Sequence, residues 1–558
     1  MDFFCSKDCP DLCGMEISAT APPWTITGKA QNWCSPGFVC AKFNDFATRE
    51  INNGLLSWQK QAGELTEYRD PATALDALAG WLDGFRDKNI LLLRGSGSLG
   101  YNMGYWDQLF SMFRQCHQVV GDPCNATGET AHQEDFGSVN NPCPSNLETA
   151  ETIILYGKNA AVTSPHFYVY LKKLKAAGAE IILLDPVRTA TAALADHYMM
   201  IHPACDGLLA CALLTELGYE QNYPVAELLA TAGICDSDFQ LLLDRIRHRQ
   251  VAHVQGLGLQ RQENGMNAVR WINRLAQRTG ATDRLYYGHG SKRLWRKHPA
   301  HFSRQVDIVE LPARLAAGEF DLLVNIAANP AVTYPDSQLW ATGLQRTPTL
   351  VVDTNRSATA AYADFFLKVG GMFAQEDFQA SYFFPHQYTR AALTDELSDL
   401  QAVQGLASRL NIPLTLRTAA ELALPALPPR VYQTADLDLH WPQQMRDYRL
   451  LTASHPAYLN SQIVAGQEQG LQVVHINPRD AARFDIASGH RVSIEGDCGA
   501  FTAFAQVTED VPEMTLMCWK NLPMPQGFCN SAVPSRMTDS GDGLAYYAAE
   551  VRILKLPD

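Results

Sequence analysis

The 558-residue chain lacks long apolar segments, an excess of basic residues, internal repeats and low-complexity tracts. No stretch approaches the roughly 20 apolar residues that a helix needs to cross a bilayer. The formal net charge of −14 leaves no basic surface to offset phosphate groups. We therefore expect no nucleic-acid partner, no binding to an anionic membrane and no direct membrane insertion.

The N-terminus also lacks a readable targeting signal. Its first residues contain no twin arginine and no charged segment followed by an apolar one. Fourteen cysteines in such a chain favour reduced thiols and metal ligands over disulfides. We therefore expect a cytoplasmic protein.

At 558 residues the chain is too long for one hydrophobic core, so several domains are expected. Short apolar strands alternate with helical stretches, and this alternation predicts parallel sheets covered by helices on both faces. The expected strands are residues 89–94, 152–157, 180–186, 320–325 and 349–353, with a helix over 167–177. Glycine-rich turns such as 95–100 follow these strands, where ligands of parallel sheets bind.

The pattern changes after a proline-rich stretch at 424–429, which predicts a linker. Short strands are expected beyond it, at 472–476, 490–494, 501–507 and 550–554. They predict a C-terminal β-barrel.

Five cysteines lie within the first forty residues. Cys5, Cys9 and Cys13 are evenly spaced and Cys40 follows later, so a short loop supplies three thiolates and a distant segment the fourth. This three-plus-one spacing favours an iron–sulfur cluster. Four thiolates can also bind zinc, although zinc sites usually present two Cys-x-x-Cys pairs, so zinc is the alternative. Cys34 is the alternative fourth ligand.

Distinctive segments lie along the whole chain. They are CSKDCPDLCG at 5–14, GFVCAKF at 37–43, LLDPVRTATAALADHYMMIHPACDG at 183–207, NPAVTYPDS at 329–337, DTNRSATAAYAD at 353–364, HINPRDAARFDIASGHRVSI at 475–494 and GFCNSAVPSRMTDSGDGLAYYAAEVRI at 527–553. Together these segments resemble the molybdopterin oxidoreductases of the dimethyl sulfoxide reductase and formate dehydrogenase superfamily.

The resemblance implies an α/β multidomain fold with an N-terminal iron–sulfur domain, two related doubly wound nucleotide-binding domains and a C-terminal barrel. The implied boundaries are 1–55 for the cluster, 56–135 with 320–430 for one α/β domain, 136–319 for the other and 436–558 for the barrel. The implied cofactors are a [4Fe-4S] cluster and two molybdopterin guanine dinucleotides that hold molybdenum or tungsten. Lys42 would lie between the cluster and the nearer pterin.

The resemblance also implies which residues contact the dinucleotides. A carboxylate at the end of a strand can accept hydrogen bonds from ribose or guanine N–H groups, although an Asp can equally cap a turn. The expected contacts are Gly157, Asp185, Arg188, Thr189 and Asp206 on one side, Asn329, Asp353, Thr359 and Asp364 on the other, and His455 and Asn530 from the barrel. His289 also lies at a family-like position, without an assigned role.

Cys124 stands where the family supplies a protein ligand to the metal. A soft thiolate suits a metal that already binds sulfur. Cys116, in an expected helix, and Cys143, between two prolines, are alternatives, as is a buried structural role for Cys124. Formate dehydrogenases of the family carry histidine at the next position, and Asn125 in its place argues against formate oxidation.

Two ionisable residues follow Cys124 on an expected helix. Glu129 and His132 are three positions apart and would share a face. They are candidates for proton delivery to the metal, and a solvated helix face is the alternative.

The expected function is two-electron redox chemistry on a small-molecule substrate, either oxo or sulfur transfer or proton-coupled oxidation. Electrons would pass by Lys42 and the cluster to an electron-transfer iron–sulfur protein or subunit. One alternative is a hydratase or transhydroxylase that uses the metal as a Lewis acid, for which Asp8 and Asp11 beside Cys9 are relevant. Another is an electron-transfer subunit that has lost the metal.

Overall fold

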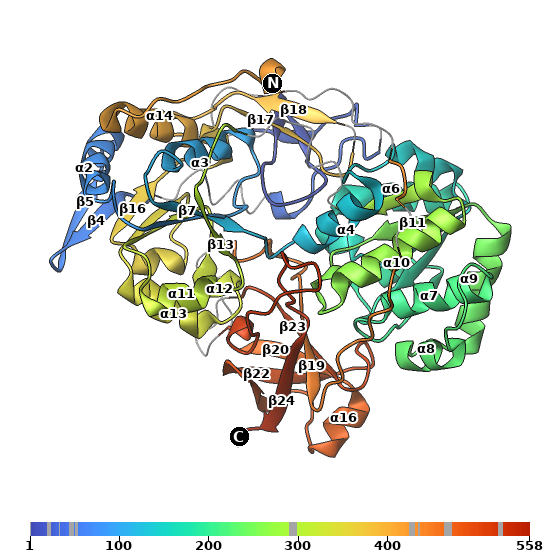
Figure 1. The fold of residues 1–558 in the computed structure, drawn as a ribbon. Coiled ribbons are helices and arrows are strands. Elements are labelled where there is room, and N and C mark those ends of the chain that lie inside the picture. Colours follow the sequence, from blue (N-terminus) through green and yellow to red (C-terminus); the bar gives the residue numbers. More distant parts are fainter. Residues whose placement is uncertain are drawn as a thin grey trace.

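A computed structural model describes residues 2–18, 24–32, 34–43, 50, 54–288, 298–384, 386–422, 430–433, 436–462, 471–522 and 528–557. It contains a three-stranded sheet, an eight-stranded sheet, a five-stranded sheet, a two-stranded sheet and a closed barrel (Figure 1). This architecture confirms the expected α/β multidomain fold with a C-terminal barrel. The predicted linker at 424–429 and His289 lie outside the described residues. Within these ranges no helix has the length and apolar character needed to cross a membrane.

The N-terminal sheet is antiparallel and small. It consists of β1 (Asp2–Phe4), β2 (Gly14–Ile17) and β3 (Ile26–Gly28). The loop between β1 and β2 carries Cys5, Cys9 and Cys13, and the backbone N–H of Cys5 donates to the carbonyl of Cys13 at 3.1 Å. Buried Phe3 and Met15 pack against Phe373, which fixes this sheet on the eight-stranded part.

The five-stranded sheet is parallel throughout, in the order β10-β9-β8-β11-β12. Its strands are β8 (Thr152–Tyr156), β9 (Glu180–Leu184), β10 (His197–Met199), β11 (Val251–Gln255) and β12 (Leu285–Tyr287). Alternate residues face opposite sides: Ile153 and Leu155 pack under α6 (Pro165–Ala176), and Ile154 packs under α7 (Asp206–Glu216) and α10 (Gly265–Arg278). The order of the strands reverses between β8 and β11.

The eight-stranded sheet has the order β13-β7-β6-β14-β15-β16-β4-β5 and is parallel from β13 to β16. Its strands are β4 (Ser57–Gln61), β5 (Glu64–Tyr68), β6 (Ile90–Arg94), β7 (Cys116–Val120), β13 (Arg304–Asp307), β14 (Leu322–Ile326), β15 (Thr349–Asp353) and β16 (Phe365–Lys368). Helices α2 (Pro71–Asp83), α3 (Gly104–Phe110) and α14 (Asp399–Leu410) share a core with one face, and α11 (Leu311–Ala317) and α13 (Ser337–Arg346) share a core with the other. Its strand order reverses between β6 and β14.

Three local features differ from the sequence expectations. Cys116 lies on β7 rather than on a helix, because the segment 116–120 pairs with β6. β13 joins the eight-stranded sheet although its residues precede the expected boundary at 320. Helix α4 (Ala126–Phe136) packs on α10, and its Ala131 and Phe136 belong to the core of the five-stranded part.

The barrel closes in the order β19-β23-β20-β22-β21-β24. Its strands are β19 (Tyr448–Ala453), β20 (Gln472–Ile476), β21 (Arg491–Gly496), β22 (Gly499–Val507), β23 (Thr515–Trp519) and β24 (Ala549–Lys555). Its core is continuous with that of α11 and α13, where Leu516 and Trp340 belong to one hydrophobic cluster. The barrel therefore lies against both large parts of the molecule (Figure 1).

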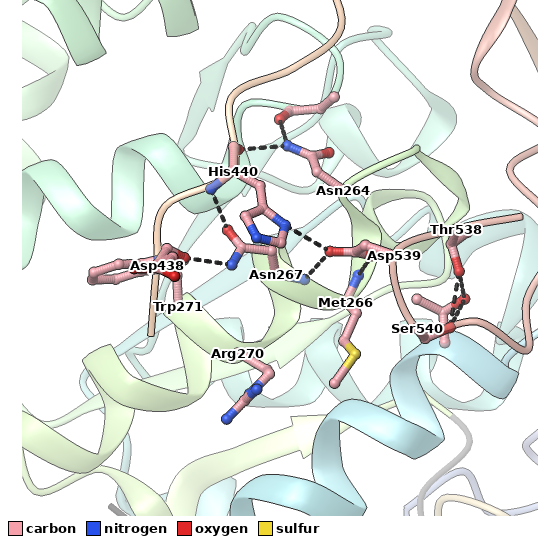
Figure 2. Close-up of polar contacts among 12 residues, drawn as sticks. Asn264, Met266, Asn267, Arg270, Trp271, Asp438, His440, Thr538, Asp539 and Ser540 are labelled. Atoms are coloured by element: carbon pink, nitrogen blue, oxygen red, sulfur yellow. Dashed lines mark hydrogen bonds and ion pairs between the residues drawn. The ribbon is translucent and has the colours of Figure 1, made fainter. Parts of the chain in front are cut away.

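A loop of the barrel domain also holds the start of α10 (Figure 2). The Asp539 carboxylate accepts hydrogen bonds from the backbone N–H groups of Met266 (2.7 Å) and Asn267 (2.9 Å). A carboxylate at a helix N-terminus satisfies N–H groups that have no partner within the helix. Nδ1 of His440 lies 3.3 Å from the same carboxylate, so three segments distant in sequence meet here.

Candidate functional site

Two cavities lie at the two places where strand order reverses. The first, of about 320 Å³, is lined by the turns after β6 and β14, including Gly95 and Asn329. The second, of about 160 Å³, is lined by the turns after β8 and β11, including Gly157 and Gly258. Such positions are where ligands of open parallel sheets bind. The N-terminal loop and the barrel contribute lining residues to both cavities.

Glycine shapes the second cavity because two turns touch there. Gly157 has φ +53°, which favours glycine. A Cβ atom on Gly256 would lie 2.1 Å from the carbonyl oxygen of Gly157. The close approach of the two turns therefore depends on the absence of a side chain at position 256.

We expect Gly256→Ala to destabilise the protein by about 1–3 kcal/mol, because the two turns must separate. Gly80→Ala is the matched control, since Gly80 lies in α2 and a Cβ there meets no atom within 4 Å. It should stabilise the protein by about 0.4–1 kcal/mol. Urea unfolding of both variants measures the difference, and equal stabilities would contradict the close-contact argument.

Cys124 lies where the two cavities meet. Asp8, Cys124, Arg261, Asn460 and Lys520 line both cavities. Oδ1 of Asp122 accepts hydrogen bonds from the N–H groups of Cys124 and Asn125, both at 2.7 Å, and so fixes the loop before α4. Burial and the Asp8 carboxylate raise the pKa of the Cys124 thiol to about 11, against the opposing effect of Arg261. Cys116 and Cys143 line neither cavity.

Arg261 and Lys520 were not foreseen from the sequence. Arg261 follows the glycine-rich turn after β11, and a glycine-rich turn after a strand is the same signal that singled out Gly157. Lys520 directly follows β23, and no pattern in the sequence distinguishes it from other lysines.

The four predicted cluster thiols lie together at the N-terminal loop. The thiol of Cys13 is hydrogen-bonded to Cys40. Cys5 and Cys9 interact electrostatically with Cys13, and Cys40 does so with Cys5 and Cys9. This hydrogen bond lowers the pKa of Cys40, whereas burial raises the pKa of Cys5 to about 12.

Cys34 is turned away from this group. Its Sγ lies 2.9 Å from Oδ1 of Asn32, and it belongs to the core under α6. In the described ranges no three Cys, His, Asp or Glu side chains converge on a site for a single metal ion. The choice between an iron–sulfur cluster and zinc stays a prediction.

Lys42 bridges the thiol group and the second cavity. Its Nζ donates to the carbonyls of Val162 (3.1 Å) and Tyr458 (3.2 Å) and lines that cavity. Burial lowers its pKa, and the nearby Cys9 and Cys40 oppose this shift.

A histidine that the sequence did not single out contacts a predicted cluster ligand. Nε2 of His166 lies 2.9 Å from Sγ of Cys13, and Nδ1 lies 2.5 Å from Oγ of Ser35. The backbone N–H of His166 donates to the buried carboxylate of Asp11 at 2.8 Å. Burial lowers the pKa of His166 to about 4, so the ring is neutral at pH 7.

Two buried carboxyl groups line the second cavity, and the Oδ1 atom of Asp185 accepts a hydrogen bond from the N–H of Val187 at 3.1 Å. Burial raises the pKa of Asp185 and of Asp206 to about 7, and the Asp206 carboxylate adds to the shift of Asp185. Oγ1 of Thr189 is buried with no hydrogen-bond partner in the described part of the chain. These groups fit a ligand rich in N–H and O–H donors, such as guanine and ribose.

The raised pKa values have a consequence for stability. A carboxyl group whose pKa is higher in the folded state binds more protons when the protein is folded. Its contribution to the free energy of unfolding therefore falls as pH rises from about 4 to about 7. In the cofactor-free protein, Asp185→Asn should therefore stabilise more at pH 8 than at pH 5, by up to about 3 kcal/mol. Urea unfolding at both pH values tests this, and a pH-independent difference would contradict it.

Other expected dinucleotide contacts do not line either cavity. The Thr359 hydroxyl donates to Oδ1 of Asn329 at 2.8 Å and so positions Asn329. Asn329 and Asp353 both line the first cavity. Arg188 lies over the ring of Tyr198, with Nε 3.8 Å from Asp510. The remaining residues make internal contacts: Asp364 accepts from Thr349 N–H, Asn530 donates to the Val332 carbonyl, and His455 stacks on Tyr458.

Glu129 and His132 line neither of the two cavities described above. Glu129 is hydrogen-bonded to Asn125, at the start of α4. His132 faces β11, where Nε2 lies 2.8 Å from Oε1 of Gln255, and burial lowers its pKa to about 3. His132 is buried against β11 and Glu129 is half-buried, and neither lines the two cavities, so proton delivery by these residues stays a prediction.

Comparisons with known proteins agree with this geometry. Residues 102–367 match the model of the molybdopterin oxidoreductase family, and residues 448–549 match that of the molybdopterin dinucleotide binding domain. The chain is 23% identical to the probable oxidoreductase YyaE of Bacillus subtilis, over 68% of this chain and 64% of the relative. It is 25% identical to the assimilatory nitrate reductase catalytic subunit of the same organism, over 67% of this chain and 62% of the relative. The matches thus span less than two thirds of the length of these curated relatives.

The fold is similar to that of acetylene hydratase from Pelobacter acetylenicus, with a TM-score of 0.75 and 13% identity over 100% of both chains. The matched regions contain Cys124, the five-stranded sheet, strands β7, β13, β14 and β15 of the eight-stranded sheet, and barrel strands β19 to β23. The protein therefore belongs to the molybdopterin oxidoreductase superfamily.

Proposed function

We propose that the protein is a molybdenum- or tungsten-dependent oxidoreductase that performs two-electron chemistry on a small substrate. The observation that carries this proposal is the position of Cys124, which lines two cavities at once. Two dinucleotides, one in each cavity, would hold a metal that Cys124 also binds. This cofactor would supply oxo or sulfur transfer or proton-coupled oxidation.

The residues of the chain hold and orient these groups. Asp185 and Asp206 would accept hydrogen bonds from one guanine dinucleotide, and Asn329 and Asp353 would contact the other. Cys124 would bind the metal as the thiolate, which loses its proton when the metal binds.

Cys5, Cys9, Cys13 and Cys40 are proposed to hold a [4Fe-4S] cluster. Such a cluster would relay electrons singly to a partner iron–sulfur protein. Lys42 supports this arrangement, because its ammonium lies between the thiol group and the second cavity and would stabilise negative charge on either side.

The direct test is an anaerobic assay of the purified protein with a redox dye against a panel of oxidised and reduced small molecules. We expect turnover with at least one of them, coupled to dye oxidation or reduction. Metal-loaded protein that exchanges no electrons with dye or substrate would contradict the redox proposal.

The position of Asp8 favours a second candidate function, that of a hydratase. This carboxylate lines both cavities beside Cys124 and accepts a hydrogen bond from Asn460 at 3.2 Å. A carboxylate there could take a proton from water that a Lewis-acidic metal activates. Acetylene hydration without electron exchange would favour this candidate, and Asp8→Asn should then abolish it.

A further inference from the structure

A buried histidine contacts one of the four proposed cluster ligands. His166, the second residue of α6, is 1% exposed, and its Nε2 lies 2.9 Å from Sγ of Cys13. Nδ1 lies 2.5 Å from Oγ of Ser35, and the ring of Phe38 meets the imidazole edge-on with 4.9 Å between the centroids. These contacts hold the imidazole in an orientation that points Nε2 at the sulfur.

The backbone of the same residue ties α6 to the loop that carries the thiols. The N–H of His166 donates to Oδ2 of Asp11 at 2.8 Å, and Asp11 lies in this loop between Cys9 and Cys13. The Asp11 side chain is fully buried. Both the backbone and the ring of His166 therefore contact the loop, so α6 fixes the imidazole relative to Cys13.

The direction of the ring's hydrogen bond follows from the chemistry of a metal-bound cysteine. Cysteine binds a metal as the thiolate, which has no proton to donate. With iron bound, Nε2 of His166 is therefore the donor, and Nδ1 of the neutral ring accepts from the Ser35 hydroxyl. Ser35 thus selects the tautomer that a metal-bound Cys13 requires.

The other three proposed ligands receive donors of a different kind. Backbone N–H groups donate to them, from Lys7 to Cys5, from Asp11 to Cys9 and from Phe43 to Cys40. Any sequence that adopts these turns supplies such donors. The contact of His166 with Cys13 comes from a side chain, so it depends on the identity of residue 166.

Resting on the proposed [4Fe-4S] cluster, we propose that His166 is a positioning residue that raises the reduction potential of the cluster through its hydrogen bond to Cys13. Reduction adds one electron to the cluster and neither forms nor breaks a covalent bond. The added negative charge spreads onto the sulfur atoms, so the hydrogen bond is stronger in the reduced state. Burial strengthens this effect, because water does not compete for the sulfur. The cluster thereby becomes a better acceptor of electrons from the metal.

The test is an anaerobic redox titration of the purified protein, followed by the low-temperature resonance signal of the reduced cluster. His166→Phe keeps a ring of similar size and removes the donor. At a fixed potential it should lower the ratio of reduced to oxidised cluster by about 3- to 10-fold, equal to about 30 to 60 mV for a one-electron couple. His166→Gln carries an amide N–H that can reach the position of Nε2, and its ratio should stay near that of the wild type.

His117→Phe is the control for replacing a buried histidine. His117 lies on β7, is 7% exposed, has Nε2 2.7 Å from Oδ1 of Asn89 and lines neither cavity. The His117→Phe protein should keep the wild-type potential. Ser35→Ala should lower the potential less than His166→Phe does, because the ring keeps its place but can adopt either tautomer.

Two results would overturn the role of His166 and leave the proposed cluster intact. One is a His166→Phe protein with wild-type iron content and an unchanged potential. The other is a His166→Gln protein that shifts as far as the His166→Phe protein, since the effect would then come from packing rather than from the donor.

A spectroscopic measurement keeps the test decisive if His166→Phe loses its iron. Wild-type protein labelled with heavy nitrogen in its histidine rings should show a nitrogen coupling to the reduced cluster, and the His166→Gln protein should lack it. A wild-type cluster without this coupling overturns the role of His166. Zinc in place of iron in the wild-type protein contradicts both the proposed cluster and the role of His166.

Discussion

Replacing Cys124 by Ala should lower turnover by at least about 100-fold, because loss of residues that only support metal ligands already costs 10- to 100-fold. The thiol lies at the point where both cavities meet, so its loss removes a proposed protein ligand to the metal without filling either cavity. The dinucleotides contact other residues and should remain bound. Dye-linked turnover and metal content together measure the effect, and the spectrum of the metal should change.

Cys143→Ala is the matched control. Cys143 is exposed, its Sγ lies 3.0 Å from Oγ of Ser145, and it lines neither cavity. Its removal should leave turnover and metal spectrum unchanged. Near-wild-type activity of the Cys124→Ala protein would show that the metal does not depend on this thiol.

The second large effect concerns the fourth cluster ligand. Cys40→Ala should reduce iron well below four atoms per chain and abolish electron transfer to a dye, because three thiolates hold a [4Fe-4S] cluster poorly. The Cys34→Ala protein should keep four iron atoms, since Cys34 is hydrogen-bonded to Asn32 and packs in the core under α6. Iron analysis and low-temperature resonance spectra of the two anaerobic proteins compare them directly.

The paired design separates the two assignments that the sequence left open. If the Cys34 variant loses iron and the Cys40 variant keeps it, Cys34 rather than Cys40 is the fourth ligand. Retention of iron in both would contradict the proposed four-thiolate cage.

The parts of the site that follow strands were readable from the sequence. Buried apolar runs predicted β8, β9 and β15. Asp185, just after β9, and Asp353, the last residue of β15, line the cavities. Parallel strands bring such residues to one edge of the sheet, so their position follows from the chain order.

Helix orientation and side-chain direction were not readable. The sequence placed Glu129 and His132 on one face of α4, but it could not show that α10 and β11 pack against this helix. Thr359 was expected at the cofactor, whereas its hydroxyl instead holds Asn329. Lys520 was missed because its environment consists of residues far away in the sequence, namely Asp8, Cys124 and Arg261.

The most direct test of the central proposal is the metal content of anaerobically purified protein. We predict about one molybdenum or tungsten and about four iron atoms per chain, as one bis-dinucleotide site and one cubane cluster require. Iron without molybdenum or tungsten, from a host that makes the cofactor, would contradict a catalytic metal at Cys124. Zinc in place of iron would contradict the cluster.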